Sequence, residues 1–258
     1  QMANKLVVEC PSADLKEAAH FKKMSSVWWD LKGEYHGQYL YDSNVVPYMV
    51  EEIINSGLLD IKYAESEKPF TGLKILEVGC GGGIMCEMLS KYGGDITGID
   101  INSYVLEVAK EHLKSADPKI TNINYILQSA EEHCLSNAEK YDLVVLNTVI
   151  QHVVEKDVLL KSCVRCLKPG GSIFISGFSQ TWIAWFLLEI LAEWWGTLPK
   201  GNSEWRKFIS IGDLENMMKW YKCKLIASKG IYHNLFTDTW TMGRCHSMSY
   251  AARFVKQE

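Results

Sequence analysis

The chain has 258 residues, of which 47% are hydrophobic, and a formal net charge of −4. This length and apolar content can bury one large core, so we expect a single domain over residues 1–258. The acidic balance disfavours a nucleic-acid partner, which would require a basic face. The eight cysteines show no framework spacing, and the pair Cys163 and Cys166 lies in a helical pattern, so we expect reduced thiols.

The first residues give no sign of export. No secretory signal opens the chain, and the stretch after Met2 contains acidic residues but no arginine, unlike a mitochondrial presequence. We therefore expect a cytoplasmic protein. The alternative is a mitochondrial, inner-membrane-associated protein whose presequence has been removed.

Helical and strand patterns follow one another along the chain. Helical periodicity predicts N-terminal helices within 13–56, over 13–30 and 46–56. In a core over 72–177, we expect strands at 74–78, 95–99, 123–128, 141–146 and 172–176, and helices at 84–92, 103–115 and 156–167. This alternation predicts an α/β fold with a doubly wound, mostly parallel, Rossmann-like sheet. An antiparallel pair near 225–230 and 248–256, within a C-terminal segment 209–258, would complete a seven-stranded sheet.

Residues 180–208 form an aromatic-rich insertion before the C-terminal strands. The stretch 181–195 has a helical pattern that is apolar nearly all round and carries two glutamates. Three overlapping interpretations are a buried helical cap over the active site, an apolar wall of an acceptor pocket that includes Trp182 and Trp185, and a membrane-surface helix at 181–196. The segment is too short and too polar to span a bilayer, but it could lie in the interface.

The most specific motif is a glycine-rich turn after the first core strand. Residues 75–83 read Ile-Leu-Glu-Val-Gly-Cys-Gly-Gly-Gly, and Asp100 follows Gly79 by 21 residues, at the end of the next strand. Glycines allow a tight turn and let a nucleotide-like ligand approach main-chain N–H groups at a helix N-terminus. A carboxylate at the second strand end can accept hydrogen bonds from ribose hydroxyls. The alternative is an ordinary strand–turn–helix joint with incidental glycines.

The spacing of this turn, with Glu77 before it, resembles the E/D-x-G-x-G-x-G loop of class I S-adenosylmethionine (SAM) methyltransferases. From Phe21 to Lys256 the chain resembles the ubiquinone-biosynthesis O-methyltransferases, which methylate catechol-type polyprenyl intermediates. Beside the glycine loop, the motifs that carry this resemblance are Trp28-Trp29-Asp30, Gly33-Glu34-Tyr35, Leu167-Lys168-Pro169-Gly170-Gly171, Pro199-Lys200-Gly201 and Ser249-Tyr250-Ala251-Ala252.

The resemblance implies SAM as the cofactor, with Gly79, Asp100 and Asn147 at cofactor-binding positions. We expect four neighbouring positions to complete the cofactor site: Glu77, Gly81, Ile101 and Ser129. The residues that we expect in the acceptor pocket are Trp182, Trp185, Tyr39 and His233.

Several site positions depart from the family pattern. Val45 stands in place of an arginine that helps to hold the cofactor. The residues Tyr39, Tyr41 and Asp42 replace a histidine, a methionine and an asparagine. The family's metal-binding Glu-x-x-Glu-His segment reads Thr148-Val149-Ile150-Gln151-His152 here. Threonine and glutamine bind a hard divalent cation poorly compared with two carboxylates, so we expect no metal.

His152 is kept in that segment, and the intrinsic pKa of an imidazole suits a general base for a phenol. We expect it to act alone or with a carboxylate partner such as Asp42 or Glu155. The alternative is a satisfied histidine at a helix start. The leading interpretation is O-methylation of a phenol or catechol, a small hydrophobic acceptor. N- or C-methylation in specialised metabolism, and a catalytically silent cofactor-binding partner in quinone biosynthesis, stay open, and the sequence does not fix the oligomeric state.

Overall fold

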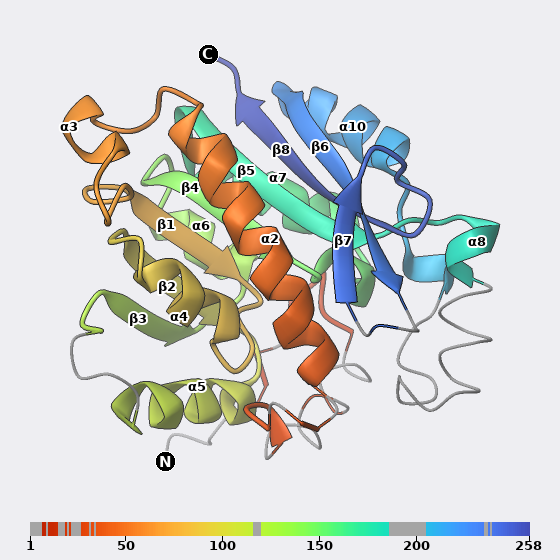
Figure 1. Ribbon diagram of the computed structural model, residues 1–258, viewed down its shortest axis with the longest axis horizontal. Coiled ribbons are helices and arrows are strands. Elements are labelled where there is room, and N and C mark those ends of the chain that lie inside the picture. Colours follow the sequence, from red (N-terminus) through yellow and green to blue (C-terminus); the bar gives the residue numbers. More distant parts are fainter. Residues whose placement is uncertain are drawn as a thin grey trace.

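The computed structural model describes residues 7–8, 10–14, 19, 21, 27–30, 32–33, 35–115, 120–185, 205–234, 237 and 239–258. In these residues one sheet has the strand order β3-β2-β1-β4-β5-β8-β6-β7 (Figure 1). The strands are β1 (Lys74–Val78), β2 (Asp95–Asp100), β3 (Ile123–Leu127), β4 (Tyr141–Asn147), β5 (Leu167–Phe178), β6 (Cys223–Asn234), β7 (Thr239–Gly243) and β8 (Ser249–Lys256). The first five are parallel, and β8, β6 and β7 join them antiparallel. The predicted doubly wound, mostly parallel α/β sheet is therefore confirmed.

The sheet has eight strands in the described residues, so the expected number of seven is wrong. The extra strand, β7, pairs with the last five residues of β6, from Gly230 to Asn234. The prediction ended this strand at residue 230, so it did not include the residues of β6 with which β7 pairs. In the structure β6 continues past the start of β8, and the end of β6 pairs with Thr239–Gly243. The threonines and the tryptophan of this segment favour a strand.

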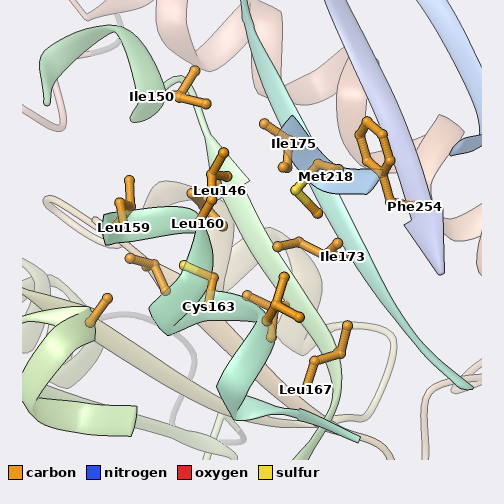
Figure 2. Close-up of a cluster of buried hydrophobic side chains, with 14 of the residues drawn as sticks. Leu146, Ile150, Leu159, Leu160, Cys163, Leu167, Ile173, Ile175, Met218 and Phe254 are labelled. Carbon is orange, nitrogen blue, oxygen red and sulfur yellow. The ribbon is translucent and has the colours of Figure 1, made fainter. Parts of the chain in front are cut away.

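Helices cover both faces of the sheet (Figure 1). They are α2 (His36–Ile54), α3 (Ile61–Ala64), α4 (Ile84–Ser90), α5 (Ser103–Ser115), α6 (Ala130–Ser136), α7 (Lys156–Cys166), α8 (Trp182–Trp185) and α10 (Ile211–Trp220), with 3-10 turns η2 (Ile150–His152) and η4 (Trp205–Lys207). One core cluster lies under α2, α4 and α5, and the other lies under α6, α7 and α10. Figure 2 shows the second cluster, in which Ile150 packs above Leu146 and Leu160. The buried Ile150 thus anchors the turn that carries His152.

The helix predicted at 46–56 begins ten residues earlier, at His36, and ends at Ile54. Proline is tolerated in a first helical turn and disfavoured inside a helix. Here Pro47 lies inside α2. The buried residues Tyr41, Val45 and Met49 recur at four-residue spacing, and their burial against the sheet outweighs the hydrogen bond that proline removes. The prediction of a helix at 13–30 falls largely outside the described residues.

The N-terminal segment crosses the carboxyl ends of the strands. The Val8 N–H donates to Ile101 O at 2.8 Å, just after β2. Farther along, the Val154 N–H donates to Ser12 O at 3.0 Å, beyond β4. Between these contacts the Ser12 N–H donates to Glu131 Oε1 at 3.3 Å. The segment therefore closes one side of the sheet edge at which parallel α/β folds bind ligands.

The two ends of the aromatic insertion pack together. The Trp205 Nε1–H donates to Thr181 O at 2.9 Å, and Phe208 joins Ala184 and Met248 in a small apolar cluster. Residues 186–204 lie outside the described residues, and so does most of the membrane-surface helix predicted at 181–196. Within the described ranges, no helix combines the length and apolar character needed to cross a bilayer.

Gly83 is the N-cap residue of α4, and replacing it tests the turn between β1 and this helix. Its φ is +89°, and a Cβ there would lie 2.3 Å from Tyr125 Oη and 3.1 Å from Ala109 Cβ. We expect Gly83→Ala to lower the free energy of unfolding by about 2–4 kcal/mol, since left-handed strain and overpacking add. The control Gly72→Ala has the same φ of +89° but open space around it, so we expect a loss of about 1 kcal/mol. Equal losses in urea denaturation would contradict this account.

Candidate active site

The carboxyl end of β4 is bonded to the N-terminal half of α2 and to the end of β5, and the ends of β1 and β2 lie next to them in the sheet. After β1 the chain turns at Gly79 and Gly81, whose φ values are +73° and +52°. The Gly79 and Cys80 N–H groups donate to Ile99 O, which ties the turn to β2. A Cβ on Gly79 would lie 2.6 Å from Val149 Cγ2, so only glycine fits beside the segment that follows β4.

Trp28 and Trp29, from the sequence motif, pack against this glycine loop. A Cβ on Gly81 or Gly82 would lie 2.4 or 2.3 Å from a ring atom of Trp28. The Trp29 Nε1–H donates to Gly82 O at 2.9 Å, and its indole stacks on His112 with ring centroids 3.4 Å apart. The absence of a Cβ at Gly81 and Gly82 therefore makes room for the indole of Trp28, and Gly81 also allows the positive φ of the turn.

Asp100 closes the loop at the end of β2. Its Oδ2 accepts the Gly81 N–H at 3.0 Å, and its Oδ1 accepts the Asn102 N–H at 2.9 Å. The surrounding protein raises the pKa of this carboxyl by desolvation. The structure thus brings Gly79, Gly81, Asp100 and Ile101 to one edge. Ser129 lies at the next strand end, where its Oγ caps α6 by accepting the Glu132 N–H at 3.1 Å.

Glu77 is a buried acid one residue before the end of β1. It is 3% exposed, and its Oε2 has no hydrogen-bond partner among the residues that the structure describes. Burial raises its pKa to about 8, and the charges of Asp42 and Asp100 add to the rise. A buried carboxyl oxygen without a partner is costly, so this position fits a ligand that brings a cation or a donor.

A buried polar network joins α2 to the ends of β4 and β5. The Asn147 Nδ2–H donates to Asp42 Oδ1 at 2.6 Å, and the Ser176 Oγ–H donates to Asn147 Oδ1 at 2.6 Å. The Gln38 Nε2–H also donates to Asp42 Oδ1, at 2.7 Å. Burial raises the pKa of Asp42 to about 7, against the lowering by these two amide donors. Within the described residues the hydrogen bonds of Asp42 go to Asn147 and Gln38, and not to His152, for which it was one possible carboxylate partner.

The segment that would carry a metal site follows directly. Thr148 has a φ of +55°, a strained conformation for a β-branched residue, and its N–H donates to Ser176 O and Oγ. Both amide atoms of the buried Gln151 lack a partner in the described part of the chain. His152 is half-buried, with its ring edge-on to Phe21 at 5.2 Å between centroids. Across the described residues, no group of three or more His, Cys, Asp or Glu side chains is arranged so that it could hold a metal ion.

The expected acceptor-pocket residues lie in different places. Tyr39 lines a cavity of about 470 Å³ between α2 and α4, together with Trp29 and His112. His233 packs on Trp240, with ring centroids 4.8 Å apart. Trp182 is 74% exposed at the start of α8. The side chain of Trp185 lies outside the described residues, so the pocket stays a prediction.

Two features of the site depend on parts of α2 that the sequence prediction missed. Because the helix was expected to begin at residue 46, neither Gln38 nor Asp42 was expected to reach β4 on a helix. The signal was present in the four-residue spacing of Tyr41, Val45 and Met49. Val45, which replaces the family's arginine, is fully buried among apolar side chains of the core.

Glu77→Gln tests the cost of burying this acid. Since the folded-state pKa is raised from 4.5 to about 8, the folded protein holds a proton that the unfolded chain has lost. Stability is therefore lost as the pH rises through that window. We expect the variant to gain stability over the wild type as the pH rises from about 5 to about 8, by a few kcal/mol at most. Thermal melts across this range measure it, with Asp95→Asn at the exposed start of β2 as control; a constant difference would refute the assignment.

Comparison with known proteins identifies the family. A family model described as a methyltransferase domain matches residues 51–228. The ubiquinone biosynthesis O-methyltransferase of Rattus norvegicus, named mitochondrial, is 32% identical over 254 residues, covering 98% of this chain and 72% of the relative. Its namesake in Bartonella bacilliformis is 30% identical over 242 residues, covering 93% and 94%. The human relative is covered over 66% of its length.

Solved structures show the same fold at low identity. Magnesium protoporphyrin IX methyltransferase from Synechocystis PCC 6803 with bound SAH, the demethylated form of SAM, aligns with a TM-score of 0.63 at 14% identity, covering 93% of this chain and 96% of that one. The same enzyme with bound SAM aligns with a TM-score of 0.57, covering 95% and 99%. From its sequence matches and its fold, the chain belongs to the ubiquinone biosynthesis O-methyltransferase family and is a SAM-dependent methyltransferase.

Proposed function

We propose that the chain transfers a methyl group from SAM to the hydroxyl of a small hydrophobic phenol or catechol, in a reaction of ubiquinone biosynthesis. The observation that carries this proposal is the meeting of the glycine loop, Asp100 and Asn147 at one sheet edge, with His152 on the next turn. The names of the relatives favour oxygen over nitrogen or carbon as the methylated atom, and an active enzyme over a silent partner.

The residues at the edge fit the parts of the cofactor. Gly79 and Gly81 form a tight turn at positive φ after β1, and Asp100 offers a carboxylate for ribose hydroxyls. Ile101 and Ser129 stand at the neighbouring strand ends, while Glu77 and Asn147 lie toward α2. The bound SAM supplies an electrophilic methyl group on a sulfonium, so the protein has mainly to align the acceptor and remove its proton.

His152 is the base in this proposal. Ile150 fixes its turn in the core, while the imidazole itself is half-buried and therefore within reach of solvent and ligand. Proton removal by a positioned imidazole requires no metal. The donor set supports this: the hydroxyl of Thr148 and the amide of Gln151 supply no charge, and charge count largely sets affinity for magnesium or calcium.

The proposal also covers the acceptor pocket, membrane contact and the cellular location. Trp182, Trp185, Tyr39 and His233 would line or cover the acceptor, with peripheral membrane contact through 181–196. The relatives include proteins named mitochondrial and bacterial ones, and a cytoplasmic location stays a prediction for this chain.

Asp100→Ala tests the cofactor site. Loss of the ribose hydrogen bonds, and of the acceptor for the Gly81 N–H, should weaken SAM binding by a few kcal/mol, on the order of two charged hydrogen bonds. Titration calorimetry with SAM measures this. The control Asp95→Ala removes an exposed carboxylate from the start of the same strand and should bind as the wild type does. Unchanged affinity in Asp100→Ala would remove Asp100 from the site.

His152→Ala tests the base, and a chelator tests the metal. We expect turnover of a catechol to fall by roughly two to four orders of magnitude in the variant, as for a lost general base. Wild-type turnover should survive excess chelator. In the converse variant, Thr148→Glu with Gln151→Glu, added magnesium should begin to affect the rate. The proposal is wrong if chelator abolishes wild-type turnover and magnesium restores it.

A further inference from the structure

Ser176 makes two hydrogen bonds with a single hydroxyl near the end of β5. Its Oγ accepts the Thr148 N–H at 3.1 Å, and its Oγ–H donates to Asn147 Oδ1 at 2.6 Å. The side chain is almost fully buried. A hydroxyl can donate and accept at the same time, which an aliphatic side chain cannot do. Ser176 therefore ties two consecutive residues at the end of β4 to the neighbouring strand.

Thr148 is the first residue that this hydroxyl supports. Its φ is +55°, in the left-handed region that a β-branched residue rarely occupies. Such a conformation persists only where the surrounding contacts fix it. The Thr148 N–H donates to the main-chain O of Ser176 at 3.2 Å as well as to Oγ, and the Thr148 Oγ1–H donates to Asn147 O at 2.8 Å. The end of β5 therefore holds the strained backbone of Thr148 in place.

The turn that follows Thr148 connects the glycine loop with His152. Val149 packs so closely against this loop that a Cβ on Gly79 would lie 2.6 Å from Val149 Cγ2. Ile150 is fully buried in the core, and the His152 N–H donates to Val149 O at 2.9 Å. A change in backbone direction at Thr148 would therefore disturb both the contact with the glycine loop and the position of the imidazole.

The second bond of Ser176 fixes the orientation of the Asn147 amide. Because the hydroxyl donates to Oδ1, the amide turns its Nδ2 toward Asp42, and the Nδ2–H donates to Asp42 Oδ1 at 2.6 Å. Asn147 is 8% exposed, so an Oδ1 that lost its donor would stay buried without a partner, which is costly. Ser176 therefore also sets the side chain of a residue that we expect in the cofactor site.

We propose that Ser176 is a positioning residue of this methyltransferase. Through its hydroxyl it holds the Asn147 amide and the strained Thr148, and through these two residues it keeps the glycine loop and His152 in the arrangement that binds SAM and removes the acceptor proton. The inference rests on the proposed cofactor site and on the proposed role of His152. Ser176 acts through its neighbours, so it need not touch either substrate.

Ser176→Val and Ser176→Thr separate the effect of the hydroxyl from the effect of side-chain volume. The two replacements have nearly the same shape, so the packing cost of the added methyl group is common to both, and only threonine keeps the hydroxyl. In titration calorimetry we expect Ser176→Val to bind SAM about tenfold more weakly, in line with one lost buried hydrogen bond, and Ser176→Thr to stay within about threefold of the wild type.

Turnover of a catechol gives a second readout, which a purely structural role would not change. At a temperature at which all variants are folded, kcat of Ser176→Val should be about ten- to hundredfold lower than kcat of Ser176→Thr, because a misplaced base slows the chemical step. The KM for the catechol should differ by no more than about twofold, since the acceptor pocket itself is unchanged.

Ser172→Ala is the matched control for the loss of a buried hydroxyl. Ser172 lies four residues earlier on the same strand and is fully buried, and its Oγ has no hydrogen-bond partner in the described part of the chain. This variant should keep the SAM affinity and the kcat of the wild type, whereas Ser176→Ala should lose both. The comparison of the two alanine variants decides the question if the added methyl group prevents Ser176→Val and Ser176→Thr from folding.

Two results would overturn the proposal. In the first, Ser176→Ala and Ser176→Val melt at lower temperatures but keep the wild-type SAM affinity and kcat while folded, so that Ser176 only stabilises the fold. In the second, the threonine and valine variants have equal SAM affinities and rates. The affinity measurement requires no acceptor. A wild type that binds SAM but methylates no catechol would therefore contradict the proposed function, and the SAM affinities would still decide on Ser176.

Discussion

The hydrogen bond from Asn147 Nδ2 to Asp42 Oδ1 holds the site together. It joins α2 to the end of β4 at 2.6 Å, inside a region where both residues are almost fully buried. Buried polar groups are stable only when paired, so each residue fixes the position of the other. The bond also sets the place of Ser176, whose hydroxyl donates to the same amide. The N-terminal half of α2 is therefore part of the candidate site, since it is bonded directly to the end of β4.

This polar contact has an energetic consequence for the rest of the face. The remainder of α2 packs through apolar residues such as Val45, Met49 and Ile53, which follow the sheet. These residues supply the burial that positions the helix, while Asp42 introduces a desolvated acid. Burying an acid costs folding stability, because an ionised carboxylate loses its hydration. The raised pKa values of Asp42 and Glu77 reflect this desolvation.

The parts of the fold that the sequence predicted are those with a local signal. β1 and the glycine loop follow from a short apolar run and from glycines at positive φ, which need no distant partner to be recognised. β7 depends on how far β6 extends beyond β8, and this extension is set by the pairing of β6 with β8, which comes after β7 in the chain. The N-terminal half of α2, which the predicted helix at 46–56 did not include, is fixed by the tertiary packing of buried residues such as Tyr41 and Val45.

In the site, too, the residues with a local sequence signal were predicted, and those that depend on tertiary contacts were not. Gly79, Gly81 and Asp100 were expected together, and the structure joins them through the Gly81 N–H. The network of Gln38, Asp42 and Ser176 was not expected, because three separate elements must first be placed. Spacing along the chain carries no information on such contacts, whereas the buried amphipathic pattern of α2 would have extended the helix toward them.

Gln151 shows how the altered segment fits its surroundings. Its side chain is 4% exposed, with both amide atoms unpaired in the described structure, and it follows the buried Ile150. A glutamate at this depth would require a nearby cation to stay ionised, because burial disfavours the charged form. A neutral amide avoids that requirement and costs only unpaired hydrogen bonds, which water or a ligand hydroxyl can supply. Glutamine at 151, together with a hydroxyl at 148, therefore adds no further acid to a region that already buries Asp42 and Glu77.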